Sequence, residues 1–134
     1  MATICYQPSA ISHFIPMPFR FESLDIWHAA RAFANAVYRI TAKFPRHEDY
    51  GLHSQMNRAA NSICLNIAEG SARSTDKAFD NYLEISIGSV FEVASASYRA
   101  MDENYITAEE HKALYNQAEI LAKRINAFRG KLHP

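Results

Sequence analysis

The sequence is poor in cysteine and in long hydrophobic runs. Its two cysteines, Cys5 and Cys64, are far apart and form no C-x-x-C pair, which argues against a disulfide framework and a structural zinc site. No run of about 18 apolar residues occurs, so we expect no membrane-spanning helix. The first residues contain several prolines and no positive charge before Arg20, unlike a signal peptide. These absences predict a protein of the reducing cytoplasm that does not enter the membrane.

An excess of charge of one sign is also missing. The chain has 14 basic and 14 acidic side chains, whereas a domain that binds nucleic acid non-specifically is expected to be clearly basic. The charges are nevertheless unevenly distributed. Residues 74–111 carry two basic and eight acidic side chains, and residues 112–134 carry five basic and one acidic. This balance argues against strong non-specific binding of nucleic acid and leaves room for a local basic patch.

Motifs that would indicate metal binding or catalysis are absent from the sequence. The six histidines show no H-x-x-x-H spacing and no carboxylate-bridged pattern. Glu69 and Glu92 are the carboxylates that an acid–base site would use, but no nucleophile, glycine-rich phosphate loop or cofactor motif accompanies them. We therefore expect no enzyme, no metal and no cofactor. A catalytic or small-ligand site would require a concave pocket lined by both carboxylates.

What the sequence does contain is helical periodicity, in a chain long enough for one domain with its own core. Nearly half of its 134 residues are apolar, so wholesale disorder is not expected. Residues 1–20 show no helical spacing, and we expect them to form an irregular N-terminal arm. Residues 21–134 are expected to form the helical domain.

The apolar spacing predicts four helices, over about residues 24–43, 52–69, 75–103 and 107–129. Phe44-Pro45 ends the first helix, because a residue before proline avoids helical dihedral angles. Gly70 follows the second helix as a left-handed C′ residue, and Thr107 with Glu110 forms a capping box for the fourth. Four helices with short connections predict an all-α, antiparallel up-down four-helix bundle.

Two of these helices are apolar over a wider arc than a bundle core requires. In the third helix, apolar residues outside the regular seam widen the arc to about 200°; they are Phe79, Tyr82, Phe91, Val93 and Tyr98. The first helix has an apolar arc of about 160°. A thick core is one explanation for these wide arcs. Because exposed apolar surface promotes association, we favour an interface between subunits.

A row of polar side chains follows one edge of the second helix, within an arc of about 80° beside its apolar face. Its members are Gln55, Arg58, Ser62, Asn66 and Glu69. Arg58 and Glu69 are about 16 Å apart along the axis, so their partners must lie on other helices or subunits if they are buried. Ser89 and Glu92 of the third helix are candidates. The row is interpreted as a network that fixes helix register or subunit pairing, with a ligand or nucleic-acid surface as the alternative.

A second set of candidates consists of the basic residues that nucleic-acid binding would have to use. They are Arg31, Arg39, Lys43, Arg46, Lys123, Arg124, Arg129 and Lys131. Each of them can equally be a solvated helix residue or complement the negative end of a helix dipole. In an oligomer every patch is repeated, so weak sites would add and binding would fall steeply with salt.

From Phe21 onward, several stretches follow the pattern of a known family. These stretches and residues are Phe21-x-x-Leu24-x-x-Trp27, Phe44-Pro45, Tyr50-Gly51-Leu52, the stretch from Gln55 to Gly70, Phe79, Leu83 and Gly88-Ser89-x-x-Glu92. The most specific of them is Asn66-Ile67-Ala68-Glu69-Gly70. In these features, over about 110 of its 134 residues, the chain resembles the four-helix bundle proteins related to those encoded in 23S rRNA intervening sequences.

The resemblance implies an up-down four-helix protomer that assembles as a homo-oligomer, a five-membered ring. A more distant branch, the accessory variability proteins of diversity-generating retroelements, uses such a ring to bind nucleic acid and a reverse transcriptase. We therefore expect a non-enzymatic, homo-oligomeric bundle that acts as a scaffold or interaction module, with further copies of itself as partners. Binding of RNA or DNA through basic patches repeated around the ring is the alternative.

Overall fold

The computed structural model describes residues 18–133, so all but the last three residues of the expected N-terminal arm lie outside the described part. Its elements are η2 (Arg20–Ser23), α1 (Asp25–Thr41), η3 (Arg46–Glu48), α2 (Leu52–Ser71), α3 (Asp76–Asp102) and α4 (Ala108–Leu132), where η denotes a short 3-10 helix. No strand occurs in this part of the chain. The all-α class and the four helices predicted from the sequence are confirmed.

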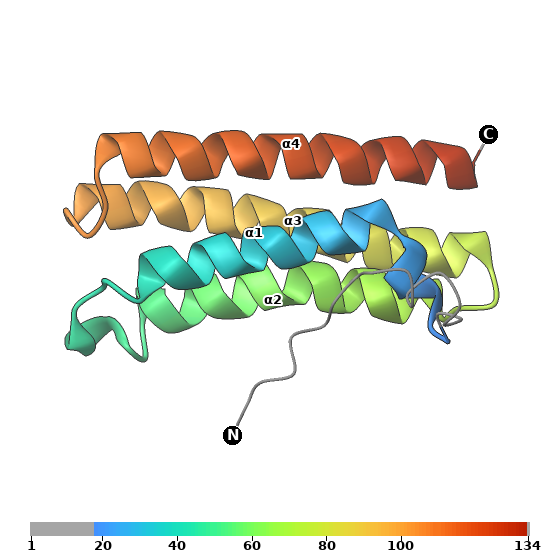
Figure 1. The fold of residues 1–134 in the computed structure, drawn as a ribbon, viewed down its shortest axis with the longest axis horizontal. Coiled ribbons are helices and arrows are strands. Elements are labelled where there is room, and N and C mark those ends of the chain that lie inside the picture. The colour runs from blue at the N-terminus through green and yellow to red at the C-terminus, as the bar shows by residue number, and fades with distance from the viewer. Residues whose placement is uncertain (1–17, 134) are drawn as a thin grey trace, which may run out of the picture.

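The four helices lie side by side with their long axes roughly aligned, and each runs opposite to the one before it (Figure 1). Helices α2 and α3 pack most extensively against each other, and the α1–α2 and α3–α4 pairs come next. Helix α4 closes the bundle against α1 with the smallest contact. Each helix therefore has two direct helical neighbours, and the rest of its circumference faces outward.

Threonine side chains cap the N-termini of α3 and α4. Thr75 Oγ1 accepts a hydrogen bond from Ala78 N at 3.1 Å at the start of α3. Thr107 Oγ1 accepts one from Glu110 N at 3.0 Å, while Glu110 Oε1 accepts one from Thr107 N at 2.9 Å, which is the predicted capping box. These bonds satisfy backbone N–H groups that the first turn leaves without helical partners.

The core is built from one apolar face of each helix. Its largest fully buried apolar side chains are Phe33, Val37, Met56, Ile63, Ile67, Phe79, Leu83, Val90, Val93, Leu114 and Ile125. Within residues 18–133, every buried side-chain nitrogen and oxygen atom has a hydrogen-bond partner. Because an unpaired buried polar group costs about 1–3 kcal/mol, this pairing removes a large penalty from the folded state.

The role of Gly70 differs from the sequence prediction. Helix α2 continues through Gly70 to Ser71, and no described glycine has a positive φ, so Gly70 is not a left-handed C′ residue. It lies against α3 instead: an added Cβ would be 2.7 Å from Tyr82 Cβ and 2.9 Å from Phe79 Cδ1. The close approach of α2 and α3, rather than the end of a helix, requires glycine at this position.

Polar contacts hold the two ends of the bundle. At one end, Arg129 Nε donates to Asp80 Oδ1 at 2.5 Å and Arg129 Nη2 donates to Asp80 Oδ2 at 3.2 Å; this guanidinium keeps the pKa of Asp80 below its ordinary value. At the other end, Leu52 N donates to Glu48 Oε1 at 3.0 Å and the Tyr105 hydroxyl donates to Glu48 Oε2 at 2.8 Å. Both bonds lower the pKa of Glu48. The Arg129–Asp80 contact links α4 to α3, and the contacts of Glu48 link η3 to α2 and to the connection between α3 and α4.

Replacing Gly70 with alanine should destabilise the bundle, although alanine is the better helix former. The added methyl group overlaps Phe79 and Tyr82, so we expect the free energy of unfolding to fall by about 1–3 kcal/mol, as overpacking typically does. The matched control is Gly88→Ala in α3, where an added Cβ meets nothing within 4 Å and should stabilise by up to about 1 kcal/mol. Urea unfolding followed by circular dichroism measures both; equal stabilities would contradict the close approach.

Candidate interaction surfaces

The inner part of the polar row on α2 forms a hydrogen-bonded network with α3. Asn66 Nδ2 donates to Ser62 Oγ at 2.9 Å and to Ser62 O at 2.8 Å. Ser89 of α3 is buried, and its hydroxyl donates to Ser62 Oγ at 2.9 Å. In the same interface, the buried Ser86 hydroxyl donates to Ile63 O at 2.9 Å. These bonds fix the register of α2 against α3 within one protomer.

The outer members of the polar row are exposed. Gln55, Arg58 and Glu69 face outward, and Glu92 does so on α3. Glu69 accepts from Arg73 Nη2 at 3.3 Å, an ion pair between α2 and the connection that follows it. Within residues 18–133, no carboxylate lies within 4 Å of the Arg58 guanidinium. The row is not buried along its length, because α3 covers only the part of the arc that holds Ser62 and Asn66.

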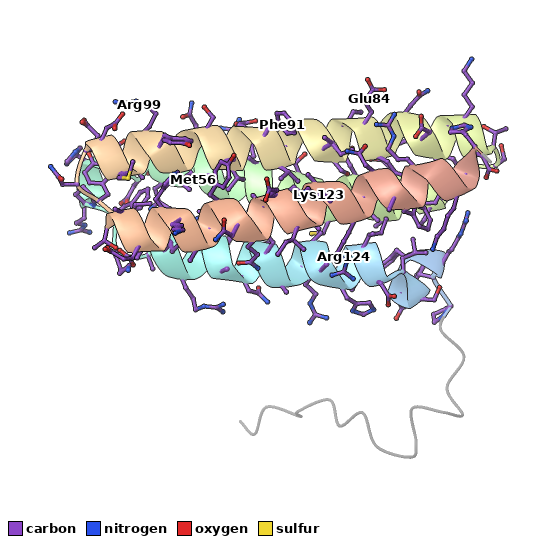
Figure 2. The ribbon with its side chains drawn as sticks, turned by 90° about the horizontal axis from the view of Figure 1, so that it is seen from above. Met56, Glu84, Phe91, Arg99, Lys123 and Arg124 are labelled. Atoms are coloured by element: carbon purple, nitrogen blue, oxygen red, sulfur yellow. The ribbon has the colours of Figure 1, made fainter. Side chains whose placement is uncertain are left out.

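Helix α3 carries more apolar surface than its two neighbours cover. Of the residues that widen its apolar arc, Phe79 and Val93 are buried in the core and Tyr82 is half-buried. Phe91 and Tyr98 lie outside the core, and Phe91 is 67% exposed. Figure 2 shows Phe91 on the α3 ribbon near its middle. The wide arc seen in the sequence therefore exceeds what the protomer buries.

Two aromatic side chains border a hollow of about 190 Å³ between α3 and α4. The lining includes Phe91, Ala94, Tyr115, Ala118, Glu119 and Ala122. The small alanine side chains of both helices leave this volume unfilled, and the rings of Phe91 and Tyr115 border it. We refer to this feature as the α3–α4 hollow.

A second exposed apolar feature lies across the α2–α3 seam, and the sequence patterns did not single out Ile85, one of its two members. Leu65 of α2 is 64% exposed and Ile85 of α3 is 52% exposed. Leu65 follows Ser62 by three residues and Ile85 precedes Ser89 by four, so in antiparallel helices both lie about 4.5–6 Å to the same side of the Ser62–Ser89 bond. In the sequence, Ile85 is an apolar residue that does not belong to the regular seam of the third helix, and this position could have identified it. We refer to these two residues as the Leu65–Ile85 pair.

Three of the eight candidate basic residues are engaged by carboxylates. Lys43 donates to Glu110, a contact that holds the pKa of that carboxyl below its ordinary value. Lys123 lies 3.9 Å from Glu119 in the next turn, and Arg129 makes the ion pair with α3 described above. These three charges are partly neutralised within the protomer.

The other five have no carboxylate within 4 Å in the described part of the chain. They are Arg31, Arg39, Arg46, Arg124 and Lys131. The Arg31 guanidinium lies 5.6 Å from the centre of the Trp27 ring, a cation–π contact that leaves its charge unneutralised. Arg46 is in η3, and the remaining four are on α1 and α4, which are neighbours in the bundle.

Charge of opposite sign is concentrated on different helices. Helix α3 carries five acidic and two basic side chains, whereas α4 carries five basic and three acidic. In Figure 2, Glu84 lies on α3, and Arg124 lies on the side of α4 that faces α1. Four of the five unpaired candidate basic residues, Arg31, Arg39, Arg124 and Lys131, are therefore on α1 and α4.

Glu69 and Glu92 do not share a pocket. Taking the Ser62–Ser89 bond as the reference level, Glu69 lies about 10 Å to one side along the axis and Glu92 about 4.5 Å to the other. Glu69 borders a shallow hollow with residues 18–21 and the end of α2, and Glu92 is not part of its lining. The two carboxylates are too far apart to act on the same atom.

Two general properties of the described residues also bear on function. Residues 18–133 contain no group of three or more His, Cys, Asp or Glu side chains that could hold a metal ion. None of the helices in this range is long and apolar enough to cross a membrane.

The four antiparallel helices and their shared core define the chain as a small helical-bundle protein, and apolar residues such as Phe91 remain exposed on it. Residues 22–127 match the family model described as 23S rRNA-intervening sequence protein, and the chain belongs to this family. Among solved structures it is similar to a protein of unknown function from the S23 ribosomal protein family of Bacteroides thetaiotaomicron VPI-5482. The TM-score is 0.69 at 20% identity, over 78% of this chain and 97% of the other. No curated protein matches the chain.

Removing the Ser89 hydroxyl should weaken the α2–α3 contact. We expect Ser89→Ala to lower the free energy of unfolding by about 1 kcal/mol relative to Ser95→Ala, because it deletes a buried hydrogen bond. Ser95 is exposed on the same helix, so it corrects for the higher helix propensity of alanine. Denaturant unfolding of both variants provides the comparison, and indistinguishable midpoints would show that the Ser62–Ser89 bond does not stabilise the bundle.

Proposed function

We propose that this protein is a homo-oligomeric helical scaffold that brings partners together and does not itself catalyse a reaction. The observation that supports this proposal is the apolar surface outside a complete core, with Phe91 as its most exposed member on α3. Monomeric proteins rarely leave contiguous apolar patches uncovered unless these have a function. From the family resemblance, we further propose a five-membered ring.

The exposed apolar side chains supply part of the free energy that stable self-association requires. Fully burying a leucine, isoleucine or phenylalanine side chain contributes about 1.5–3 kcal/mol. Phe91, Leu65 and Ile85 are 67%, 64% and 52% exposed, so covering what remains exposed of them offers about 3–5 kcal/mol at each contact between copies, against an association cost of about 4–15 kcal/mol. A stable contact must therefore bury further surface around them. The half-buried Tyr82 and the exposed Tyr98 add area, and a closed assembly makes one such contact per copy.

Light scattering of the purified full-length chain, coupled to size exclusion at micromolar concentration, tests the proposal. We expect a molar mass that is a small multiple of the 15.2 kDa chain mass and that persists in moderate salt, because apolar burial is little affected by ionic screening. A mass of one chain at all concentrations would end the scaffold proposal in its homo-oligomeric form. A multiple other than five would overturn only the size of the ring.

Nucleic-acid binding is a second candidate function. It is favoured by the four basic residues on α1 and α4 that no carboxylate neutralises, Arg31, Arg39, Arg124 and Lys131. In an assembly these patches are repeated, and weak contacts to phosphate groups add through multivalency. The near-neutral net charge restricts such binding to this side of the molecule.

A gel-shift titration with a structured RNA and a DNA duplex tests this candidate. At about 50 mM salt we expect a shift that weakens at least tenfold when the salt is raised to about 200 mM, because phosphate contacts release counterions. Arg39→Glu with Arg124→Glu should abolish the shift. The control is Arg99→Glu, an exposed arginine on acidic α3 that is already paired with Asp102, and it should bind like the wild type. No shift at the lower salt concentration would exclude the candidate.

A further inference from the structure

Helices α1 and α4 make the smallest contact between neighbours in the bundle, and an exposed groove follows their seam. One hollow of about 160 Å³ is lined by Ala29 and Ala32 of α1 and by Ile120 of α4. A second hollow, of about 360 Å³, lies between the start of α1 and the end of α4. Arg124 lines both hollows, so they are adjacent. We refer to the two hollows together as the α1–α4 groove.

Small and apolar side chains give this groove its volume and its lining. Ala29 and Ala32 leave space beside Ile120, which is 57% exposed. The apolar lining of the second hollow comes from Leu24, Ile26, Ala127 and Phe128. Because covering exposed apolar surface is favourable, both hollows suit apolar side chains of a ligand.

The spacing of the two hollows matches the repeat of an α-helix. On α4 the lining of the first hollow lies between residues 117 and 124, and that of the second between residues 124 and 131. Their midpoints are therefore seven residues apart, or about 10 Å along the axis. Side chains at positions i and i+7 of another helix have the same separation and point to the same side. A helix that lies along the groove can place one apolar side chain in each hollow, as in helix-in-groove recognition.

The charged side chains of the groove are mostly basic. Arg124 and Lys131 line it, and both belong to the five basic residues without a carboxylate partner in the described part of the chain. Figure 2 shows Arg124 on the side of α4 that faces α1. Arg39 follows Ala32 by two turns and extends the basic side along α1. Asp25 is the carboxylate of the lining, so three cations against one carboxylate favour an acidic ligand.

Other carboxylates of α4 are engaged or lie farther away. Glu110 accepts from Lys43 at the far end of the α1–α4 seam. Glu119 lines the α3–α4 hollow instead and lies 3.9 Å from Lys123. Glu109 is 11 residues from Ile120, about 16 Å along the helix. The basic character of the groove therefore remains.

We infer that the α1–α4 groove binds an acidic amphipathic helix of a partner protein. Its apolar side chains at i and i+7 enter the two hollows, and its acidic side chains lie against Arg124 and Lys131. This inference rests on the scaffold proposed above, because it names the kind of partner that the scaffold recruits. Residues 1–17 of this chain contain no acidic side chain, so the chain's own N-terminal segment does not match the charge of the groove.

The test measures the fluorescence anisotropy of labelled synthetic peptides mixed with the full-length protein. The first peptide has about 16 residues, enough for four turns, with two leucines seven residues apart, glutamates on both flanks and alanine elsewhere. One control peptide has its leucines five residues apart, which separates them by about 140° around the helix. The other has lysine in place of every glutamate. We expect saturable binding of the first peptide at micromolar concentration and binding at least about tenfold weaker for both controls.

A matched pair of variants tests the apolar part of the site. Ile120→Gln removes the apolar side chain of the first hollow, and we expect it to weaken binding about fivefold to tenfold. Its control is Ile85→Gln on α3, where the replaced side chain is 52% exposed; it should bind within about twofold of the wild type. Both sites are on the surface, so both variants should keep their helical circular dichroism.

A second pair tests the charge. Arg124→Glu should bind the acidic peptide at least about fivefold more weakly at low salt and should bind the lysine peptide more tightly than the wild type does. Its control is Arg99→Glu, at the exposed arginine of α3 that is paired with Asp102, and it should bind both peptides like the wild type. If the acidic peptide does not bind, or binds Ile120→Gln and Arg124→Glu as tightly as the wild type, the inference is overturned.

Two further outcomes would identify a different occupant and overturn the inference. If the peptide dissociates a wild-type oligomer, another copy of this chain occupies the groove. If the peptide does not bind and Ile120→Gln abolishes the RNA gel shift, nucleic acid occupies it. A wild type that is a single chain and still binds the peptide as expected would end the homo-oligomeric scaffold proposal and leave this inference standing.

Discussion

A four-helix bundle covers only part of the circumference of each helix, and the rest of the structure depends on this constraint. Each helix has two direct neighbours, and one bundle face accounts for roughly 100° of its surface. Helix α3 has buried Phe79 and Val93 on that face and still carries Phe91, Tyr98 and Ile85 outside it. Apolar surface of this extent on a folded protomer is either an interface or an aggregation hazard.

Because α2 and α3 are in tight contact, the exposed apolar residues on them form a surface that is already rigid. Gly70 allows the two helices to approach until an added Cβ would touch Tyr82 and Phe79, and the Ser62–Ser89 bond holds their register. Leu65 and Ile85 are therefore held at similar levels along two helices that do not move independently. A surface that is already ordered loses less entropy when a partner binds it.

Much of the fold follows from local rules in the sequence. The Thr107 capping box and the apolar seams rest on interactions within a few residues, and the structure contains both. Helix α1 ends at Thr41, three residues before the Phe44-Pro45 stop that the sequence predicts. The role of Gly70 could not be predicted, because a glycine near the end of a helical pattern suits a left-handed C′ position and a close helix contact equally well.

The candidate surfaces were predictable only in part, for a related reason. Helical spacing places a side chain relative to its own axis, but which neighbour covers that side depends on contacts distant in sequence. The polar row on α2 was correctly located, yet only its inner members Ser62 and Asn66 meet α3, while Arg58 and Glu69 face outward. The exposure of Leu65 and Ile85 likewise depends on the angle at which α2 and α3 pack.

Hydroxyl-radical footprinting of the wild-type chain, at protein concentrations below and above the assembly threshold, tests the central claim most directly. The side chains of Phe91 and Leu65 should become protected as concentration rises, because copies of the chain cover them. Tyr50, which is 100% exposed in a turn at one end of the bundle, should react equally at both concentrations and serves as the internal reference. If Phe91 and Leu65 react as freely as Tyr50 at every concentration, the apolar surplus of α3 is not an interface.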